Sequence, residues 1–270
     1  MRDHRLGSVL FLWLFVLATV PLALAAPSAR ERKEMIPRQV GGSQEAAPFE
    51  EATLYFELND TDGDLGFHGL IDGEEWDRLI ITSPDGKQNL TVTARGSLRQ
   101  QGMTELFFES GEPSFDELSP EETFQRFPAG EWTITGRTLD NTTLQSVVTV
   151  RHVLPAPPGN VQISGEAAAE SCDAATLPSV SGPVMISWDP VTTSHPDIGE
   201  SGTIEAERYQ LVVEREEPNL LVFSVDLPPD VTSFTIPQEF IALGDAFKFE
   251  ILVRDTGGNQ TAVESCFEID

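Results

Sequence analysis

Acidic side chains recur at every second position of one short segment, residues 59–66, which read Asn-Asp-Thr-Asp-Gly-Asp-Leu-Gly. A further aspartate, Asp72, follows shortly after this segment. Hard cations such as Ca²⁺ prefer several oxygen ligands drawn from one flexible loop. Asp60, Asp62 and Asp64, together with Asp72, therefore form a candidate calcium site.

The spacing of these aspartates departs from the EF-hand loop, which needs glycine at its sixth position and glutamate at its twelfth. Counted from Asp60, those positions hold Leu65 and Ile71. Two interpretations therefore stay open. The segment is either a looser calcium site in a β-loop or a polar turn that connects two strands. No cofactor other than calcium is expected.

Catalytic chemistry has little support in the sequence. After the N-terminal leader the histidines are His68, His152 and His195, and no Gly-x-Ser-x-Gly elbow, metal-binding histidine pair or phosphate-binding glycine loop accompanies them. With 44 acidic residues, paired carboxylates are expected by chance, so a glycoside-processing enzyme is only a remote alternative. We predict no catalytic residue and no enzymatic activity.

Three aromatic residues, Phe67, Trp76 and Trp132, have the side-chain types that stack on sugar rings in carbohydrate-binding modules. The alternating pattern around Trp132 favours a core position for that residue. Trp76 is followed by Asp77 and Arg78, which makes it the better candidate for an exposed sugar-binding residue.

The charge of the chain excludes two classes of partner. Its 270 residues include 17 Lys and Arg against 44 Asp and Glu, which gives a formal net charge of −27. A nucleic-acid binder needs a basic surface to displace counterions from phosphates, and anionic lipid headgroups attract cations. We therefore expect neither nucleic acid nor a lipid surface as partner. The hydrophobic share of 40% is sufficient for folded cores.

The first 25 residues have the composition of an export leader. Arg2 and Arg5 precede an uncharged, mostly apolar run over residues 6–24, which ends in Ala-Leu-Ala at 23–25. We predict a signal peptide over 1–25, a flexible linker over 26–47, and a periplasmic or secreted mature chain. An uncleaved N-terminal anchor is the alternative, because about 20 apolar residues can span a bilayer.

The two cysteines, Cys172 and Cys266, lie 94 residues apart. In an exported chain, two cysteines predict one disulfide. Closing so long a loop contributes on the order of 4–5 kcal/mol to stability in the chain-entropy model.

Residues 155–270 contain short runs in which apolar and polar side chains alternate, the period of a β-strand with one buried face. The runs include Val-x-Ile-Ser-Trp at 184–188, Tyr-x-Leu at 209–211 and Phe-x-Ile-x-Val at 249–253, after a proline-rich entry at 155–158. In these residues the segment resembles the fibronectin type III family. The resemblance implies a β-sandwich that serves as a spacer or binding surface.

This resemblance and the alternation place Trp188, Tyr209 and Phe249 in the core; a ligand-stacking pair is the alternative for the first two. The family usually has a tyrosine where this chain has Phe249, and that hydroxyl bonds to the backbone. Phe249 can fill the core but cannot form the bond. The sequence has no Arg-Gly-Asp triplet, so integrin-type adhesion has no support.

The segment before residue 155 also shows strand-like alternation, most clearly at 53–58, 76–82, 90–94, 104–108, 132–135 and 144–150. Ser-Pro-Glu-Glu at 119–122 is a capping box with proline in the first turn, which predicts one short helix. Residues 127–150 are similar to the closing strands of bacterial immunoglobulin-like modules. The similarity implies an immunoglobulin-like sandwich over 48–154.

The sequence therefore predicts an all-β protein with two β-sandwich domains in tandem, 48–154 immunoglobulin-like and 155–270 of fibronectin type III. The predicted function is a non-enzymatic, exported interaction or structural module. It would bind protein or glycan partners at the cell surface or in the periplasm through loops and strand edges. The alternative is a calcium-dependent adhesion or carbohydrate-binding module.

Overall fold

The computed structural model describes residues 46–270. The predicted signal peptide and almost all of the predicted linker lie outside these residues. Of the linker, Ala47 is described, and it is bonded to the sheet: its N–H donates to the Thr143 carbonyl at 3.0 Å. Within 46–270, no helix is long and apolar enough to cross a membrane.

The first half of the described chain, residues 46–154, consists of six strands and two short helices. These are β1 (Glu51–Asn59), β2 (Asp64–Thr82), β3 (Gln88–Thr93), α1 (Gly96–Gln101), β4 (Met103–Glu109), α2 (Pro120–Arg126), β5 (Gly130–Thr138) and β6 (Thr143–Val150). The predicted helix is confirmed in α2, where the Ser119 hydroxyl accepts a hydrogen bond from the Glu122 N–H at 3.3 Å. The sequence analysis missed α1, so its prediction of a single helix is wrong.

The long strand β2 belongs to both layers of the first half. Its residues 64–72 pair with β1 and β4, whereas residues 76–82 pair with β3 and β5, and the register shifts between Asp72 and Trp76. The two layers enclose a core in which the rings of Phe67 and Trp132 lie 5.3 Å apart. The first half is thus a β-sandwich whose layers share one strand.

The second half, residues 155–270, is a sandwich of two sheets. Its elements are β7 (Gln162–Ile163), β8 (Glu166–Ala167), β9 (Ser179–Val180), β10 (Met185–Ser187), β11 (Ala206–Arg215), β12 (Leu221–Leu227), β13 (Ser233–Thr235), α3 (Gln238–Ile241), β14 (Ala246–Asp255) and β15 (Gln260–Ile269). One sheet has the order β13-β10-β7-β8, and the other contains β12-β11-β14-β15. This confirms the all-β class and the predicted sandwich.

The buried residues of the second half include Trp188, Tyr209 and Phe249, with exposed fractions of 4%, 0% and 1%. The Trp188 and Tyr209 rings pack edge to face at 5.4 Å, and the Tyr209 hydroxyl accepts a hydrogen bond from the Val191 N–H at 2.8 Å. The predicted disulfide between Cys172 and Cys266 is confirmed.

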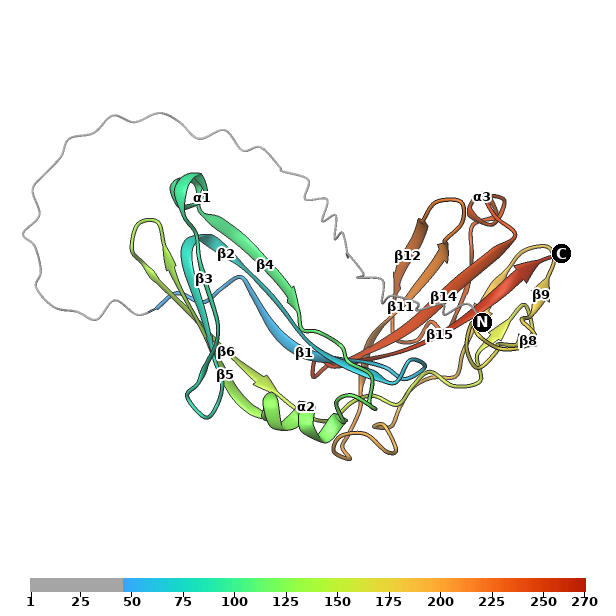
Figure 1. The fold of residues 1–270 in the computed structure, drawn as a ribbon, viewed down its shortest axis with the longest axis horizontal. Coiled ribbons are helices and arrows are strands. Elements are labelled where there is room, and N and C mark those ends of the chain that lie inside the picture. Colours follow the sequence, from blue (N-terminus) through green and yellow to red (C-terminus); the bar gives the residue numbers. More distant parts are fainter. Residues whose placement is uncertain (1–45) are drawn as a thin grey trace, which may run out of the picture. The chain divides into compact units, whose positions relative to one another are not determined.

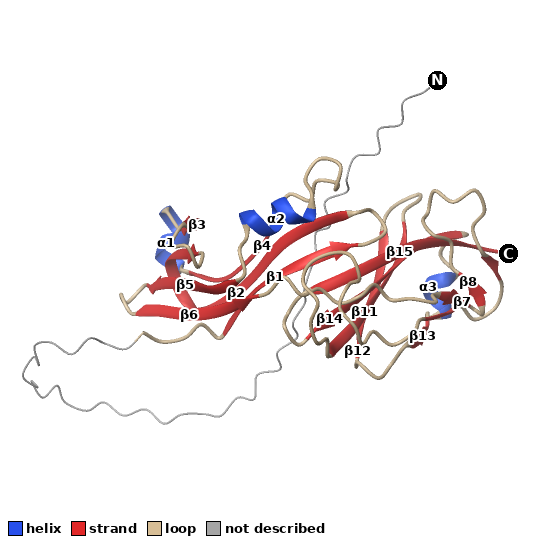
Figure 2. Ribbon diagram, turned by 90° about the horizontal axis from the view of Figure 1, so that it is seen from below, coloured by secondary structure: helices blue, strands red, loops and turns tan. Residues whose placement is uncertain are grey.

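The two halves are hydrogen-bonded into one sheet, which the sequence analysis did not predict. Strand β1 runs parallel to β15, with Glu57 opposite Gln260 and Asn59 opposite Ala262. The resulting order is β12-β11-β14-β15-β1-β2-β5-β6, and Figures 1 and 2 both show β1 beside β15. Each half nevertheless has its own hydrophobic core.

Candidate functional site

The predicted calcium ligands Asp60, Asp62 and Asp64 lie together at the turn between β1 and β2. Asp60 Oδ1 is 2.9 Å from His195 Nε2, and Asp62 Oδ2 accepts a hydrogen bond from Asn59 Nδ2 at 3.4 Å. Asp64 is the first residue of β2. Among residues 46–270, no group of three or more histidine, cysteine or acidic side chains is arranged to hold a metal ion.

The fourth predicted ligand, Asp72, does not join this turn. It lies eight residues beyond Asp64 along the same strand. At the rise of an extended strand this is about 26 Å. Its carboxylate instead accepts a hydrogen bond from the adjacent Gly73 N–H at 2.9 Å. The calcium prediction therefore applies at most to the three aspartates of the turn.

The histidines have structural partners. His195 Nδ1 accepts hydrogen bonds from the N–H groups of Asp197 (3.1 Å) and Ile198 (2.9 Å), so the proton lies on Nε2, which donates to Asp60. His152 Nε2 lies 2.9 Å from the Phe127 carbonyl oxygen. Both contacts stabilise loops, and neither places the ring beside a nucleophile.

The aromatic residues proposed to stack on sugars are in the core. Trp76 and Trp132 are completely buried and Phe67 is 2% exposed, so the interpretation of Trp76 as an exposed sugar-binding residue is wrong. The indole N–H of Trp76 donates to the Thr104 carbonyl at 3.3 Å. Every aromatic side chain of residues 46–270 is buried or partly buried.

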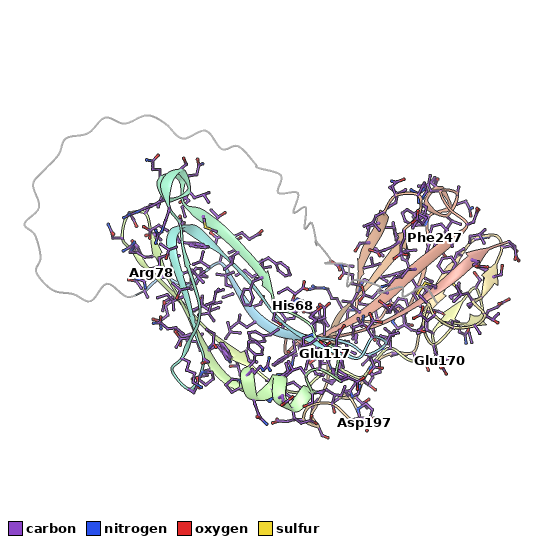
Figure 3. The ribbon with its side chains drawn as sticks, viewed as in Figure 1. His68, Arg78, Glu117, Glu170, Asp197 and Phe247 are labelled. Carbon is purple, nitrogen blue, oxygen red and sulfur yellow. A yellow bond between two sulfur atoms is a disulfide. The ribbon has the colours of Figure 1, made fainter. Side chains whose placement is uncertain are left out.

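A different feature is prominent in the structure: one face of the shared sheet is rich in carboxylates. We call it the acidic face and define it by seven residues: Glu57, Asp64, Glu109, Glu112, Glu214, Glu250 and Glu264. Glu250 lies opposite Glu264 in the β14–β15 ladder, and Glu109 lies opposite His68 in the β2–β4 ladder. Figure 3 labels His68 on this part of β2.

Burial of these carboxylates changes their ionisation. Burial, with the added charges of Glu112 and Asp62, raises the pKa of Asp64 to about 7. Burial alone raises the pKa of Glu112 to about 7. The pKa of Glu250 is raised well above its usual range by burial and then by the charge of Glu57. Burial therefore opposes the ionised forms of these three carboxylates.

Two contacts fix carboxylates on this face. Lys248 Nζ lies 2.6 Å from Glu264 Oε2, and His68 Nε2 lies 2.9 Å from Glu112 Oε1. A Cβ at Gly66 would lie 1.9 Å from Glu112 Oε1 and 2.7 Å from His68 Nε2, so a larger residue there would displace this pair. Burial lowers the pKa of the His68 ring, which favours its neutral form.

The acidic face continues to an open edge of the sheet. Strand β12 ends the strand order, and its register with β11 runs without a bulge from Leu221 to Leu227. Val222 is 51% exposed and lies opposite Glu214, so it shares the side of the acidic face. Natural edge strands usually contain charged side chains, above all lysine, or proline or a bulge that prevents pairing. The residues of β12, Leu-Val-Phe-Ser-Val-Asp-Leu, include neither lysine nor proline, and Asp226 is the one charged residue among them.

Sequence reasoning missed the acidic face because it followed only the inward residues of each strand. In β14 the inward residues Phe247, Phe249 and Ile251 alternate with Lys248 and Glu250. The outward residues of the same strands, such as Lys248 and Glu250, were the sequence signal that could have revealed this face. Its meaning depends on the pairing of β1 with β15, which local patterns do not reveal.

Comparisons with known proteins identify no family. No protein-family model matches the chain, and no curated protein matches it. Three solved structures are similar in part. A structure of a 1.5-MDa bacterial ice-binding adhesin matches with a TM-score of 0.23 and 12% identity over 84% of this chain and 66% of that chain, and a tetra-tandem repeat from the extending region of a large adhesion protein matches with a TM-score of 0.24 and 9% identity over 81% of this chain and 50% of that chain. The FN1-FN3 domains of chicken CNTN1 match with a TM-score of 0.28 and 11% identity over 83% of this chain and 69% of that chain. This chain thus spans 66% and 50% of the two adhesion fragments. TM-scores of this size carry no functional argument.

Proposed function

We propose that this protein is an exported, non-enzymatic interaction module that binds an extended, basic segment of a partner protein along β12. The observation that supports the proposal is the unprotected edge of β12 beside the acidic face. The proposal keeps the predicted division at residue 155, with an immunoglobulin-like domain before it and a fibronectin type III domain after it. It places the mature chain in the periplasm or outside the cell, consistent with the disulfide.

An added strand gains affinity and specificity from different parts of this surface. Main-chain hydrogen bonds to the free edge supply affinity without regard to sequence, and alternate side chains supply specificity. Every second side chain of the partner strand would lie on the side of Val222 and Asp226. Because Glu214 on the neighbouring strand β11 lies on that side, as does Asp226 of β12 itself, lysine or arginine at alternate positions fits best.

The experiment compares two labelled peptides that alternate valine with a charged residue, one with lysine and one with glutamate. Fluorescence anisotropy with the mature chain measures their affinities. We expect the lysine peptide to bind at least about tenfold more tightly. Hydrogen exchange should then slow at the β12 amides.

The matched variants are Val222→Lys on β12 and Leu98→Lys on α1, because both replace an exposed apolar residue, 51% and 57% exposed, with the same cation. Val222→Lys should weaken binding of the lysine peptide about tenfold. Leu98→Lys should leave it unchanged. Equal binding of both peptides, or equal effects of both variants, would contradict the proposal.

A further inference from the structure

The second unassigned feature is a hollow of about 340 Å³ at the α1 end of the first half. It is lined by Asp77, Thr93, Ala94, Arg95, Arg99 and Arg137. Three arginines against one aspartate leave its lining with a net charge of +2. The volume lies within the range of about 300–1,000 Å³ that is usual for small-ligand pockets.

Cations are concentrated at this hollow although the protein is strongly acidic. Residues 46–270 contain 11 lysines and arginines. Three of them line the hollow. A fourth, Arg78, lies opposite both Thr93 and Arg137 in the strand ladders, and Figure 3 labels it on β2. Such a concentration of guanidinium groups differs from the rest of the surface.

Asp77 holds two of these arginines in place. It is 7% exposed, and both of its carboxylate oxygens accept hydrogen bonds from Arg137, from Nη2 at 2.8 and 2.9 Å and from Nε at 3.0 Å. Arg99 Nε lies 3.5 Å from Asp77 Oδ2. Asp77 therefore pre-organises the guanidinium groups, which lowers the entropy cost of binding a further anion.

One other arginine of the lining is left to bind a ligand. Within the described part of the chain, Arg95 forms neither an ion pair nor a side-chain hydrogen bond. Its side chain is exposed. A guanidinium group presents its N–H donors as a planar fork that matches the two oxygens of a carboxylate. Arg137 already binds Asp77 in this way.

We propose that this hollow is a binding site for a carboxylate group, with Arg95 as its free donor and Arg99 and Arg137 held beside it by Asp77. The site is separate from the β12 edge and does not depend on the proposed function. The carboxylate could belong to an acidic peptide or to a sugar acid. None of the residues that line the hollow is aromatic, so nothing there stacks on a sugar ring. This favours the peptide.

The test titrates the mature chain with three probes at about 0.15 M salt, where long-range attraction is screened. The probes are acetyl-Gly-Asp-Asp-Gly-amide, glucuronate and inorganic phosphate. NMR spectra that resolve the arginine Nε–H groups report which side chains respond. We expect a shift of Arg95 with the peptide. Tighter binding of the peptide than of glucuronate identifies a polypeptide source, and the reverse order identifies a sugar acid.

Variants separate carboxylate recognition from general attraction of anions. Arg95→Gln should weaken binding about tenfold, the loss expected for hydrogen bonds to a charged group. Arg95→Lys keeps the positive charge but loses the planar pair of N–H donors. It should therefore bind the peptide little better than Arg95→Gln does. Arg126→Gln, which alters an exposed arginine of α2 away from the hollow, is the matched control and should have no effect.

Three results would overturn the proposal. One is the absence of arginine shifts with both carboxylate probes. Another is phosphate binding as tightly as either of them. The third is full rescue by Arg95→Lys. Because Arg95 is exposed and unpaired, its variants should fold, and a loss of binding can be assigned to the site.

Discussion

One side chain, that of Asn259, connects the two halves through three hydrogen bonds. This residue is 1% exposed and lies in the turn between β14 and β15. Its Oδ1 accepts a hydrogen bond from the Phe56 N–H of β1 at 2.9 Å, and its Nδ2 donates to the carbonyls of Arg151 and Val153, each at 2.8 Å. One amide thus joins the turn, β1 and the segment between the halves.

Asn259→Ala should therefore be strongly destabilising. One buried and two part-buried hydrogen bonds at about 1 kcal/mol each are lost, and the buried Phe56 N–H is left without its acceptor at about 1–2 kcal/mol more. The expected loss is about 4 kcal/mol. This is a large part of the roughly 5–15 kcal/mol that is usual for a folded domain. The matched control is Asn89→Ala, because Asn89 is exposed and, among residues 46–270, its side chain hydrogen-bonds only to the Lys87 carbonyl, at 3.2 Å.

Urea unfolding followed by tryptophan fluorescence measures the effect. Trp76 and Trp132 report on the first core, and Trp188 reports on the second. We expect Asn259→Ala to shift both signals to lower urea concentrations and Asn89→Ala to shift neither. A loss below about 1 kcal/mol for Asn259→Ala would refute the reasoning, because it would show that water replaces all three bonds.

Three further predictions concern ionisation, calcium and the disulfide. Since Asp64 and Glu112 have a pKa of about 7 in the folded chain, against roughly 4 when unfolded, the free energy of unfolding should fall as the pH rises from about 4 to 7. Urea unfolding across this pH range measures the effect. Asp64→Asn should make the free energy of unfolding less dependent on pH, and a free energy of unfolding that rises with pH would contradict the prediction. The calcium interpretation predicts a thermal midpoint several degrees higher in Ca²⁺ than in chelator, a difference that Asp62→Asn should remove; equal midpoints would end that interpretation. Reduction of the Cys172–Cys266 disulfide should lower the unfolding free energy by about 4–5 kcal/mol, because the bridge spans 94 residues, and a loss near zero in urea would count against the entropic argument.

Local patterns predicted most of the strands because burial on one face imposes a two-residue period. The expected strand at 53–58 is β1, and the capping box at Ser119 begins α2. The same patterns missed the length of β2. Glycines at 66, 69 and 73 interrupt its alternation. A Cβ would lie 1.9 Å from Glu112 Oε1 at Gly66 and 2.4 Å from the Phe108 ring at Gly69, whereas at Gly73 it would meet no atom closer than 3.2 Å.

The candidate sites were harder to predict than the strands, because each depends on contacts between distant residues. Asp60 was selected as a calcium ligand from its spacing, but its partner is His195, 135 residues away. The arginines of the hollow come from separate elements, with Arg95 just before α1 and Arg137 on β5. Sequence spacing gives no indication that they meet. Only the pairing of β2 with β3 and β5 brings them together.

The shared sheet has a consequence for binding at β12. A partner strand added there would extend the same hydrogen-bonded sheet that includes β15 and β1. Burial, followed by the charge of Glu57, raises the pKa of Glu250 on β14. A basic partner stabilises the ionised form of Glu250, so its binding should be tighter at pH values where Glu250 is ionised. Peptide binding at β12 and protonation of the acidic face are therefore linked. A lysine peptide should release fewer protons when it binds a variant that lacks Glu250 than when it binds the unchanged chain.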